Sequence, residues 1–522
     1  MILEVQLRLT PSQAANADLV REAVCRKARI APRTLNALRV LRRSIDARAR
    51  EPMVEVAVAV YSGNDSPQEN PPVEYPDVRG AEEIIIVGSG PAGMFAALKA
   101  IECGYRPIVL ERGKDVHARR RDIKALCTQH IVDPDSNYCF GEGGAGTYSD
   151  GKLYTRSKKR GDTSGILARL VQHGASPEII TDARPHIGTD KLPAVVENIR
   201  RQIVQCGGDY LFGRRVSDLQ IRHGRVCGVE TLGGERFEAR AVILATGHSA
   251  RDIYELLHRK GIALQAKGTA IGVRLEHPQD LIDRIQYGPK GRGQYLPAAA
   301  YRVVAQSGGR GVYSFCMCPG GYIVPSATDA RQVVVNGMSP SMRNGRKANS
   351  GIVVSVEPQD LPPQYERYGV MGLLQFIRDI ECRAWEAGGK TQTAPAARMT
   401  DFCQKHISSS LPDTTYLPGI VPADLDQVLG PFIAPRLREG LQAFGRKMRG
   451  FYTAEATLIG VETRTSSPLR IPRDPATLAH PQVSGLFPSG EGAGYAGGIV
   501  SAAVDGQNCA LAAIEYLKNK AK

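Results

Sequence analysis

The sequence IIIVGSGPAG occupies residues 84–93 and decides the expected fold. Its first four residues are β-branched, which is typical of a strand buried on both faces in a parallel sheet. Three glycines follow with the spacing GxGxxG, and a helix-forming stretch comes directly after them. Gly88 permits a tight turn, Gly90 lets the backbone approach a pyrophosphate, and Gly93 lets the helix pack closely on the strand. The pattern therefore predicts a helix N-terminus that faces the phosphates of a dinucleotide.

A second buried strand and an acidic residue complete this unit. Residues 107–110 read PIVL and lead to Glu111, 18 residues past Gly93. A carboxylate at the end of this strand is placed to accept hydrogen bonds from a ribose 2′-hydroxyl. It also disfavours a 2′-phosphate, so NADP is not expected in this site. We predict a βαβ dinucleotide-binding unit in preference to an ordinary glycine-rich turn.

The C-terminal segment favours FAD over NAD. Residues 486–506 read LFPSGEGAGYAGGIVSAAVDG, in which a short strand precedes Glu491, several glycines and a helix that begins near Ile499. A carboxylate can bind ribityl hydroxyls, and glycines let the backbone approach a flat ring. A helix N-terminus can face the flavin pyrimidine, where reduction places negative charge. We therefore predict non-covalently bound FAD; the alternative is a simple glycine-rich helix start.

Several of these motifs resemble those of known flavoproteins. VGSGPAG (87–93), SGEG (489–492) and ATG (245–247) look like the glutathione-reductase-type flavoprotein fold. More narrowly, the chain resembles a family of uncharacterised bacterial FAD-dependent dehydrogenases, which implies FAD as the redox centre and leaves the substrate open. The stretches that carry this resemblance are FGEGGAGTYSDGKL (140–153), HIGTDKL (186–192), ATGHSARD (245–252), FCMCPGG (315–321), VVVNGMS (333–339) and VETRTSSP (461–468).

The predicted fold class is α/β. We expect a Rossmann-like FAD-binding domain with three layers and a mainly parallel sheet, interrupted by an inserted mixed α+β substrate or cap domain. A small α+β module with the order β-α-β-β precedes it. The expected boundaries are 1–75 for the module, 80–265 and 456–522 for the FAD-binding domain, and 266–455 for the substrate domain.

The predicted cofactor site also includes a glycine-rich loop. Residues 141–151 contain five glycines among eleven residues, and their N–H groups would form an anion-binding nest. The alternative is a flexible surface loop. The predicted cofactor-binding residues are Gly88, Gly90, Pro91, Ala92, Gly93, Glu111, Arg112, Gly143, Gly144, Thr147, Ser149, Val216, Thr246, Gly247, Gly490, Glu491, Gly497, Gly498 and Ile499.

Three residues are candidates for the chemistry. Cys316 and Cys318 would point to one face of a strand, where two thiols near a flavin could exchange electrons with it. The alternative is two small buried hydrophobes. Arg464 could hold an anionic substrate or stabilise reduced flavin, or could form a structural ion pair. Cys139 lies where some similar flavoproteins carry a redox disulfide, but its CxxxxC partner is absent, which argues against a disulfide reductase.

Further polar residues are open in their role. His248, Arg251 and Asp252 follow the ATG stretch and could bind cofactor phosphate or substrate, or could cap the next helix. Asn336 is a weaker polar candidate in the expected substrate domain.

The net charge bears on the class of partner. The 522 residues include 67 Lys and Arg against 53 Asp and Glu, a formal net charge of +14. Such an excess can favour nucleic acid, or can attract phosphorylated cofactors. Arg39, Arg42 and Arg43 make the N-terminal module basic, but no aromatic platform for single-stranded nucleic acid accompanies them. A solvated basic face is therefore the preferred interpretation.

These observations predict an FAD-dependent oxidoreductase with a small-molecule substrate, and NADH or NADPH as a potential electron donor. The alternative is a flavoprotein that binds or acts on nucleic acid such as tRNA. The chain start lacks a secretory pattern, and no apolar run approaches the roughly 20 residues that span a bilayer. Eleven cysteines without a CxxC pair are typical of reduced intracellular thiols. We expect a cytoplasmic protein without membrane contact or a metal site.

Overall fold

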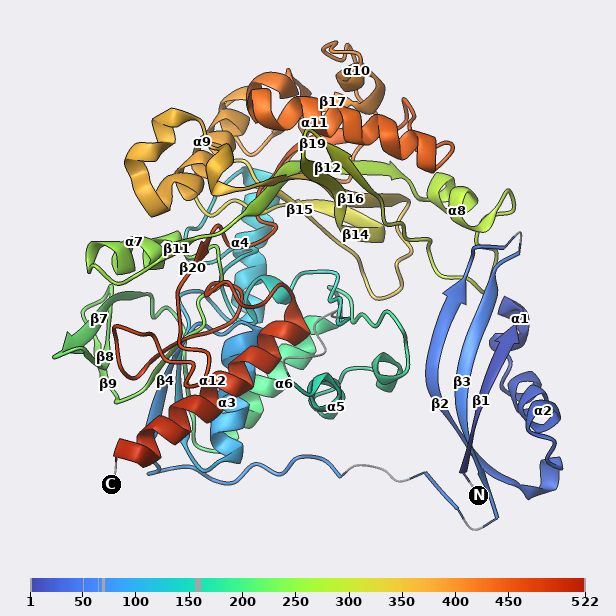
Figure 1. Cartoon of the computed structure of the whole chain (residues 1–522), viewed down its shortest axis with the longest axis horizontal. Helices are drawn as coiled ribbons and strands as arrows, with labels where there is room; N and C mark the ends of the chain where they lie inside the picture. The colour runs from blue at the N-terminus through green and yellow to red at the C-terminus, as the bar shows by residue number, and fades with distance from the viewer. Residues whose placement is uncertain (1, 50, 64, 68–70, 155–160, 521–522) are drawn as a thin grey trace.

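The structure is a computed structural model of the chain, and it has three parts (Figure 1). A small N-terminal module lies beside a domain built on a parallel sheet, and a domain built on a larger mixed sheet lies across the top of the view. We call them the N-terminal module, the parallel-sheet domain and the mixed-sheet domain. The described residues are 2–49, 51–63, 65–67, 71–154 and 161–520.

The N-terminal module is an antiparallel sheet with two helices against it. Its elements are β1 (Ile2–Leu9), α1 (Pro11–Ala14), α2 (Ala17–Ala28), β2 (Leu35–Asp46) and β3 (Met53–Ser62). The strands lie in the order β1-β3-β2, so the predicted α+β module is present with one additional short helix. Strand β2 also contacts the parallel-sheet domain, because Arg43 N donates to Thr181 O (2.8 Å) and Ala183 N donates to Arg43 O (2.9 Å).

The parallel-sheet domain has the predicted three layers. Its five parallel strands lie in the order β21 (Leu486–Pro488), β10 (Val242–Leu244), β4 (Glu83–Val87), β5 (Arg106–Leu110) and β6 (Asp209–Leu211). Ile84 and Ile86 pack against one layer, and Ile85 and Val87 pack against the other. The first layer is α3 (Pro91–Glu102), α5 (Thr163–Gln172), α6 (Leu192–Gln205) and α12 (Ile499–Lys520). The second is β7 (Val216–Arg222), β8 (Arg225–Thr231), β9 (Arg236–Glu238) and α7 (Arg251–Arg259).

The mixed-sheet domain is built on an eight-stranded sheet. Seven strands follow the order β13 (Val304–Ser307), β14 (Arg310–Pro325), β16 (Lys347–Val356), β12 (Thr269–Pro278), β19 (Thr457–Glu462), β17 (Ala394–Arg398) and β18 (Ile420–Pro422), and β15 (Val335–Met338) pairs with β14. Its helices are α8 (Gln279–Tyr287), α9 (Gly372–Ala387), α10 (Met399–Cys403) and α11 (Leu425–Lys447). The sheet extends past the predicted boundary at residue 455, because β19 pairs with both β12 and β17.

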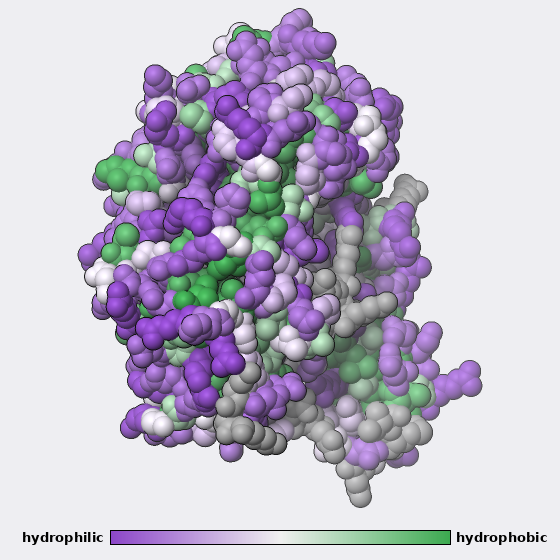
Figure 2. Space-filling view, turned by 60° about the vertical axis from the view of Figure 1, so that its left-hand side comes forward, coloured by the Kyte–Doolittle hydropathy of each residue, from purple (hydrophilic) through white to green (hydrophobic). Residues whose placement is uncertain are grey.

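A short antiparallel pair joins the two domains. Strand β11 (Gln265–Ala266) pairs with β20 (Leu469–Arg470), so the two chain crossings between the domains lie side by side. Figure 2 shows hydrophobic residues gathered near the middle of one face of the molecule, within a mostly hydrophilic surface. Within the described part of the chain, no helix is both long and apolar enough to cross a membrane.

Candidate functional site

A cavity of about 270 Å³ lies between the parallel-sheet domain and the mixed-sheet domain. One side of it is formed by the loops that follow β4, β10 and β21 at the carboxyl ends of these strands. The opposite side includes residues of β14 and β15. Open parallel sheets bind ligands outside the carboxyl ends of their strands. The cavity is therefore where a cofactor of this fold is expected.

The glycines after β4 shape one wall of the cavity. A Cβ on Gly93 would lie 1.9 Å from the carbonyl oxygen of Gly88, so a larger residue would push α3 away from the strand. A Cβ on Gly90 would meet no atom within 4 Å. Gly90 is the N-cap of α3 and provides no side-chain cap, which leaves N–H groups of the first turn available to a ligand. This wall fits the phosphates of the predicted FAD.

Glu111 is buried and ties three loops together. Its carboxylate accepts hydrogen bonds from Ser89 N (3.0 Å), Ser89 Oγ (2.6 Å), Gly113 N (2.9 Å) and Gly141 N (3.0 Å). These four bonds match the lone pairs of a carboxylate. Glu111 thus holds the shape of this wall of the cavity, and a bound ribose hydroxyl would have to share a carboxylate oxygen with one of these donors.

The glycine-rich loop is fixed by a buried arginine that sequence reasoning missed. Arg119 of α4 (Val116–Gln129) donates from Nε to Asn137 O (2.7 Å), from Nη1 to Glu142 O (2.9 Å) and from Nη2 to Gly144 O (2.9 Å). Its side chain is fully buried, and its guanidinium lies over the ring of Tyr148. The loop is therefore held rigidly against the cavity.

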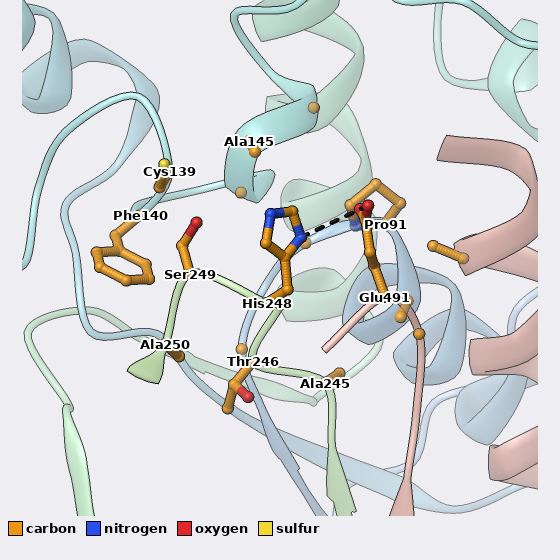
Figure 3. A pocket seen from close by; sticks show the side chains of 18 of the residues that line it. Pro91, Cys139, Phe140, Ala145, Ala245, Thr246, His248, Ser249, Ala250 and Glu491 are labelled. Atoms are coloured by element: carbon orange, nitrogen blue, oxygen red, sulfur yellow. Dashed lines mark ion pairs between the residues drawn. The ribbon is translucent and has the colours of Figure 1, made fainter. Parts of the chain in front are cut away.

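His248 and Glu491 face each other at the centre of the cavity (Figure 3). His248 follows β10, Glu491 follows β21, and 3.5 Å separates His248 Nδ1 from Glu491 Oε1. The other ring nitrogen, Nε2, is buried without a hydrogen-bond partner among the described residues. Buried polar atoms are nearly always hydrogen-bonded in native proteins. A ligand in this cavity would supply the missing partner, which fits a polar cofactor beside His248.

Arg464 brings an incompletely paired positive charge to the cavity. It lines the cavity with its side chain only 5% exposed. Its Nη2 donates to Thr328 Oγ1 (2.9 Å), whereas its Nε, 3.9 Å from Glu381 Oε1, is buried without a hydrogen-bond partner among the described residues. Glu381 already pairs with both Nη atoms of Arg251 at 2.7 Å. Two arginines thus share one carboxylate, and this end of the cavity is suited to an anion.

We expect Glu381→Gln to lower the free energy of unfolding by about 3 kcal/mol at neutral pH, because it leaves Arg251 and Arg464 without a buried counter-charge. Burial acts to raise the pKa of Glu381, but Arg251 and Arg464 lower it below its ordinary value overall. The stabilisation is therefore present above the pKa of unfolded glutamate and is lost as the pH falls through the folded pKa. Denaturant melts against pH measure this, with exposed Glu386→Gln as the control. Equal acid sensitivity in wild type and Glu381→Gln would contradict it.

The cysteine pair differs from the predicted geometry. Cys316 has a φ of 44°, and the pairing of β14 with β16 shifts register on both sides of Cys318. An irregular strand, rather than regular alternation, brings both sulfurs to one amine: Lys152 Nζ lies 3.6 Å from each Sγ. Cys316 lines the cavity and Cys318 is fully buried.

Most predicted cofactor residues meet in this one cavity. Of the residues predicted to bind the cofactor or take part in the chemistry, Gly93, Gly143, Thr147 and Cys318 are not part of the cavity lining. Thr147 Oγ1 instead donates to Glu142 O (2.6 Å), and a Cβ on Gly143 would lie 1.9 Å from that hydroxyl oxygen. The predicted residues that line the cavity are Gly88, Gly90, Pro91, Ala92, Glu111, Arg112, Gly144, Ser149, Val216, Thr246, Gly247, Gly490, Glu491, Gly497, Gly498, Ile499, Cys316 and Arg464.

The sequence analysis did not find several other lining residues. Phe315, Ser326 and Met338 come from the mixed-sheet domain. Phe315 and Met338 lie in two of the stretches that carry the family resemblance, but neither was predicted to line the site, and Ser326 lies in none of these stretches. Tyr138 and Phe140 lie just before the glycine-rich loop, and Phe140 also opens the stretch 140–153 that carries the family resemblance, so these two signals were available. The weaker candidates His248 and Asn336 do line the cavity.

Three segments of the chain match protein families. Residues 82–273 match a family described as pyridine nucleotide-disulphide oxidoreductase. Residues 268–465 match one described as FAD-dependent protein, C-terminal domain-like, and residues 1–61 match a domain of unknown function. The two larger matches meet close to the junction between the parallel-sheet domain and the mixed-sheet domain.

Similar proteins cover the chain to different extents. An uncharacterized protein of Clostridium beijerinckii is 39% identical over 518 residues, which span 95% of this chain and 96% of that protein. Protein FixC of Escherichia coli is 29% identical over 217 residues, 39% of this chain and 46% of FixC. A solved flavoprotein/dehydrogenase from Cytophaga hutchinsonii aligns over 84% of this chain and 79% of its own, with 11% identity and a TM-score of 0.36.

Proposed function

Because the chain belongs to the same family as the Clostridium beijerinckii protein and is an FAD-dependent oxidoreductase, we propose that it binds one FAD non-covalently in the cavity and acts on a small molecule beside β14 and β15. The observation that carries the proposal is the continuity of the cavity. Its lining runs from the glycines after β4 to Arg464 and the strands of the mixed-sheet domain. A cofactor and a second reactant can therefore meet in one cavity.

The parallel-sheet domain supplies the binding groups for the cofactor. The first turn of α3 presents N–H groups and a positive helix end to the phosphates, and Gly90 leaves room for them. Glu491 is placed for ribityl hydroxyls, with His248 beside it. The start of α12 at Ile499 faces the cavity and can stabilise negative charge on a flavin pyrimidine. This division of roles supports the glutathione-reductase-type arrangement.

The mixed-sheet domain supplies the groups for the second reactant. When bound, FAD supplies hydride and electron transfer, while the protein orients the reactants and excludes water. Arg464 can hold an anionic group of the substrate, since its Nε has no hydrogen-bond partner among the described residues. Asn336 adds an amide to the same cavity. The sequence has a single GxGxxG between a strand and a helix of a βαβ unit, so a nicotinamide donor would enter from this substrate side.

Anaerobic addition of NADH or NADPH to the purified protein tests this proposal. We expect the oxidised flavin absorption to bleach with one of the two donors, because both reactants have access to the same cavity. Arg464→Met should weaken the response to an anionic donor by about tenfold while leaving bound flavin in place. Flavin that stays oxidised with both donors would contradict the proposed donor. The same protein reduced with dithionite serves as the control for a competent cofactor.

A further inference from the structure

Cys316 lies at the junction of the cavity and a buried group of charges. Lys152 Nζ contacts both Cys316 Sγ and Cys318 Sγ at 3.6 Å. Arg274 Nη2 donates to Cys316 O (2.7 Å) and to Cys318 Sγ (3.4 Å). Arg274 Nη1 also pairs with Glu462 at 3.0 Å. The two thiols are therefore surrounded by cations that come from distant parts of the chain.

The charges of this group balance only if one thiol is ionised. Lys152, Arg274 and Arg343 are cations, and Arg343 pairs with Asp150 at 2.6 Å. The carboxylates are Asp150 and Glu462, so the formal sum is one positive charge with both thiols neutral. A buried charge requires a partner, and a thiolate is the nearest one available.

Cys316 is the thiol that the surroundings favour as the anion. A hydrogen bond from the Cys318 thiol, together with Lys152 and Arg274, lowers the pKa of Cys316 well below its ordinary value, against the opposing effects of burial and Asp150. Burial raises the pKa of Cys318. Cys316 also lines the cavity, whereas Cys318 is fully buried behind it. The surroundings thus favour the anion at Cys316, which lines the cavity, over Cys318, which is fully buried.

We propose that Cys316 and Cys318 form a thiol–disulfide redox pair that reduces a small-molecule disulfide in the cavity. The inference rests on the proposed function, because bound FAD must return the electrons. The pair lies in β14 of the mixed-sheet domain. It is separate from Cys139, whose missing CxxxxC partner argued against a disulfide reductase. The proposed reduction uses Cys316 and Cys318 together with Lys152 and Arg274. It therefore does not require a second cysteine paired with Cys139.

The proposed reaction has two thiol exchanges. The Cys316 thiolate attacks one sulfur of the substrate disulfide, which forms a mixed disulfide and releases the first substrate thiolate. Cys318, whose proton passes to a released thiolate, then attacks the sulfur of Cys316. This forms the Cys316–Cys318 disulfide and releases the second substrate thiolate, which takes a proton from solvent. Two electrons, delivered from NADH or NADPH through FAD, and one proton restore the Cys316 thiolate and the Cys318 thiol.

The test uses the full chain with its FAD and hydroxyethyl disulfide as the probe, under argon. Peptide mapping of the wild type should show loss of two hydrogen atoms in the peptide that holds Cys316 and Cys318, without an adduct. Cys318→Ser should trap a mercaptoethanol adduct on Cys316. Cys103→Ser, at an exposed cysteine outside the cavity lining, is the matched control and should behave as wild type.

A pH profile separates a thiolate from a merely structural cysteine. The reaction of wild-type Cys316 should change little between about pH 6 and pH 8, and Lys152→Met should slow it by about tenfold near neutral pH and make it rise with pH. The groups that face Cys316 are Cys318, Lys152, Arg274, Asp150 and Glu462. Reaction at Cys316 no faster than at Cys103 would overturn the proposal, as would a disulfide that maps to Cys139.

The last measurement is the reduction of the Cys316–Cys318 disulfide by the flavin. Addition of the reducing nicotinamide to the oxidised protein should regenerate both thiols, counted by alkylation and mass, with dithionite-reduced flavin as the backup donor. A disulfide that persists after the flavin is reduced would overturn the redox pair and leave the proposed function intact. Flavin that is reduced by neither NADH nor NADPH would contradict the proposed donor. The exchange with hydroxyethyl disulfide needs no nicotinamide and is measured separately.

Discussion

Replacing Gly90 with valine should remove FAD from the protein and leave its fold intact. A Cβ on Gly90 would meet no protein atom within 4 Å, because this position opens to the cavity. The backbone at Gly90 is extended, with φ −69° and ψ −177°, so valine fits without strain. The isopropyl group would instead occupy the space into which the phosphates must enter. We expect the Kd for FAD to rise by about 100-fold or more, which corresponds to about 2.7 kcal/mol.

Titration of the apo protein with FAD, followed by flavin fluorescence, measures this change. The melting temperature of the apo variant should stay within about 2 °C of wild type, since no packing is lost. Gly233→Val, in an exposed turn outside the cavity lining, is the control and should bind FAD normally. Gly93→Ala should behave differently from Gly90→Val and destabilise the apo protein, because its methyl group clashes with the carbonyl oxygen of Gly88. Unchanged FAD affinity in Gly90→Val would show that the phosphates bind elsewhere.

Replacing Arg119 with methionine should disorder the glycine-rich loop. The change removes three hydrogen bonds from a buried cation and leaves the carbonyls of Asn137, Glu142 and Gly144 without that donor. Hydrogen bonds that involve a charged group contribute roughly 1.5–3 kcal/mol each, and part of this is offset because the cation no longer has to be buried. We expect a loss of about 4 kcal/mol in stability and loss of FAD, because Gly144 and Ser149 line the cavity.

Denaturant unfolding and hydrogen exchange of the loop measure this second effect. The loop amides should lose their protection from exchange in Arg119→Met, while β4 and β5 keep theirs. Arg121 lies on the same helix and is exposed, so Arg121→Met is the matched control. A stable Arg119→Met variant that retains FAD would contradict the role assigned to Arg119.

The local sequence was enough to predict the strand, loop and helix that form one wall of the cavity. The strand, the glycine loop and the following helix are contiguous, and each carries its own signal within 84–93. The segments that end in Thr246-Gly247 and Gly490-Glu491 also meet this loop, because all three follow parallel neighbours of one sheet. In such a sheet, loops at the carboxyl ends of adjacent strands converge.

The substrate side could not be predicted in the same way. Lys152 and Cys316 are 164 residues apart, and they meet only because the loop that holds Lys152 packs against β14 of the mixed-sheet domain. The register shifts around Cys318 leave no clear mark in the sequence, so regular alternation was the wrong geometric basis for placing the two sulfurs. Arg119 was missed for a related reason. Nothing around it distinguishes it from Arg120 and Arg121, and only the structure shows that it alone of the three is fully buried.

The identity and amount of flavin released from the purified protein decide whether the cavity holds FAD. Heat or acid denaturation should release FAD from its site, because we propose non-covalent binding, and chromatography identifies and counts it. We expect one FAD for each chain, with colourless protein left behind. A protein that neither contains FAD nor takes it up during incubation, or that keeps its flavin covalently attached after denaturation, would contradict the account.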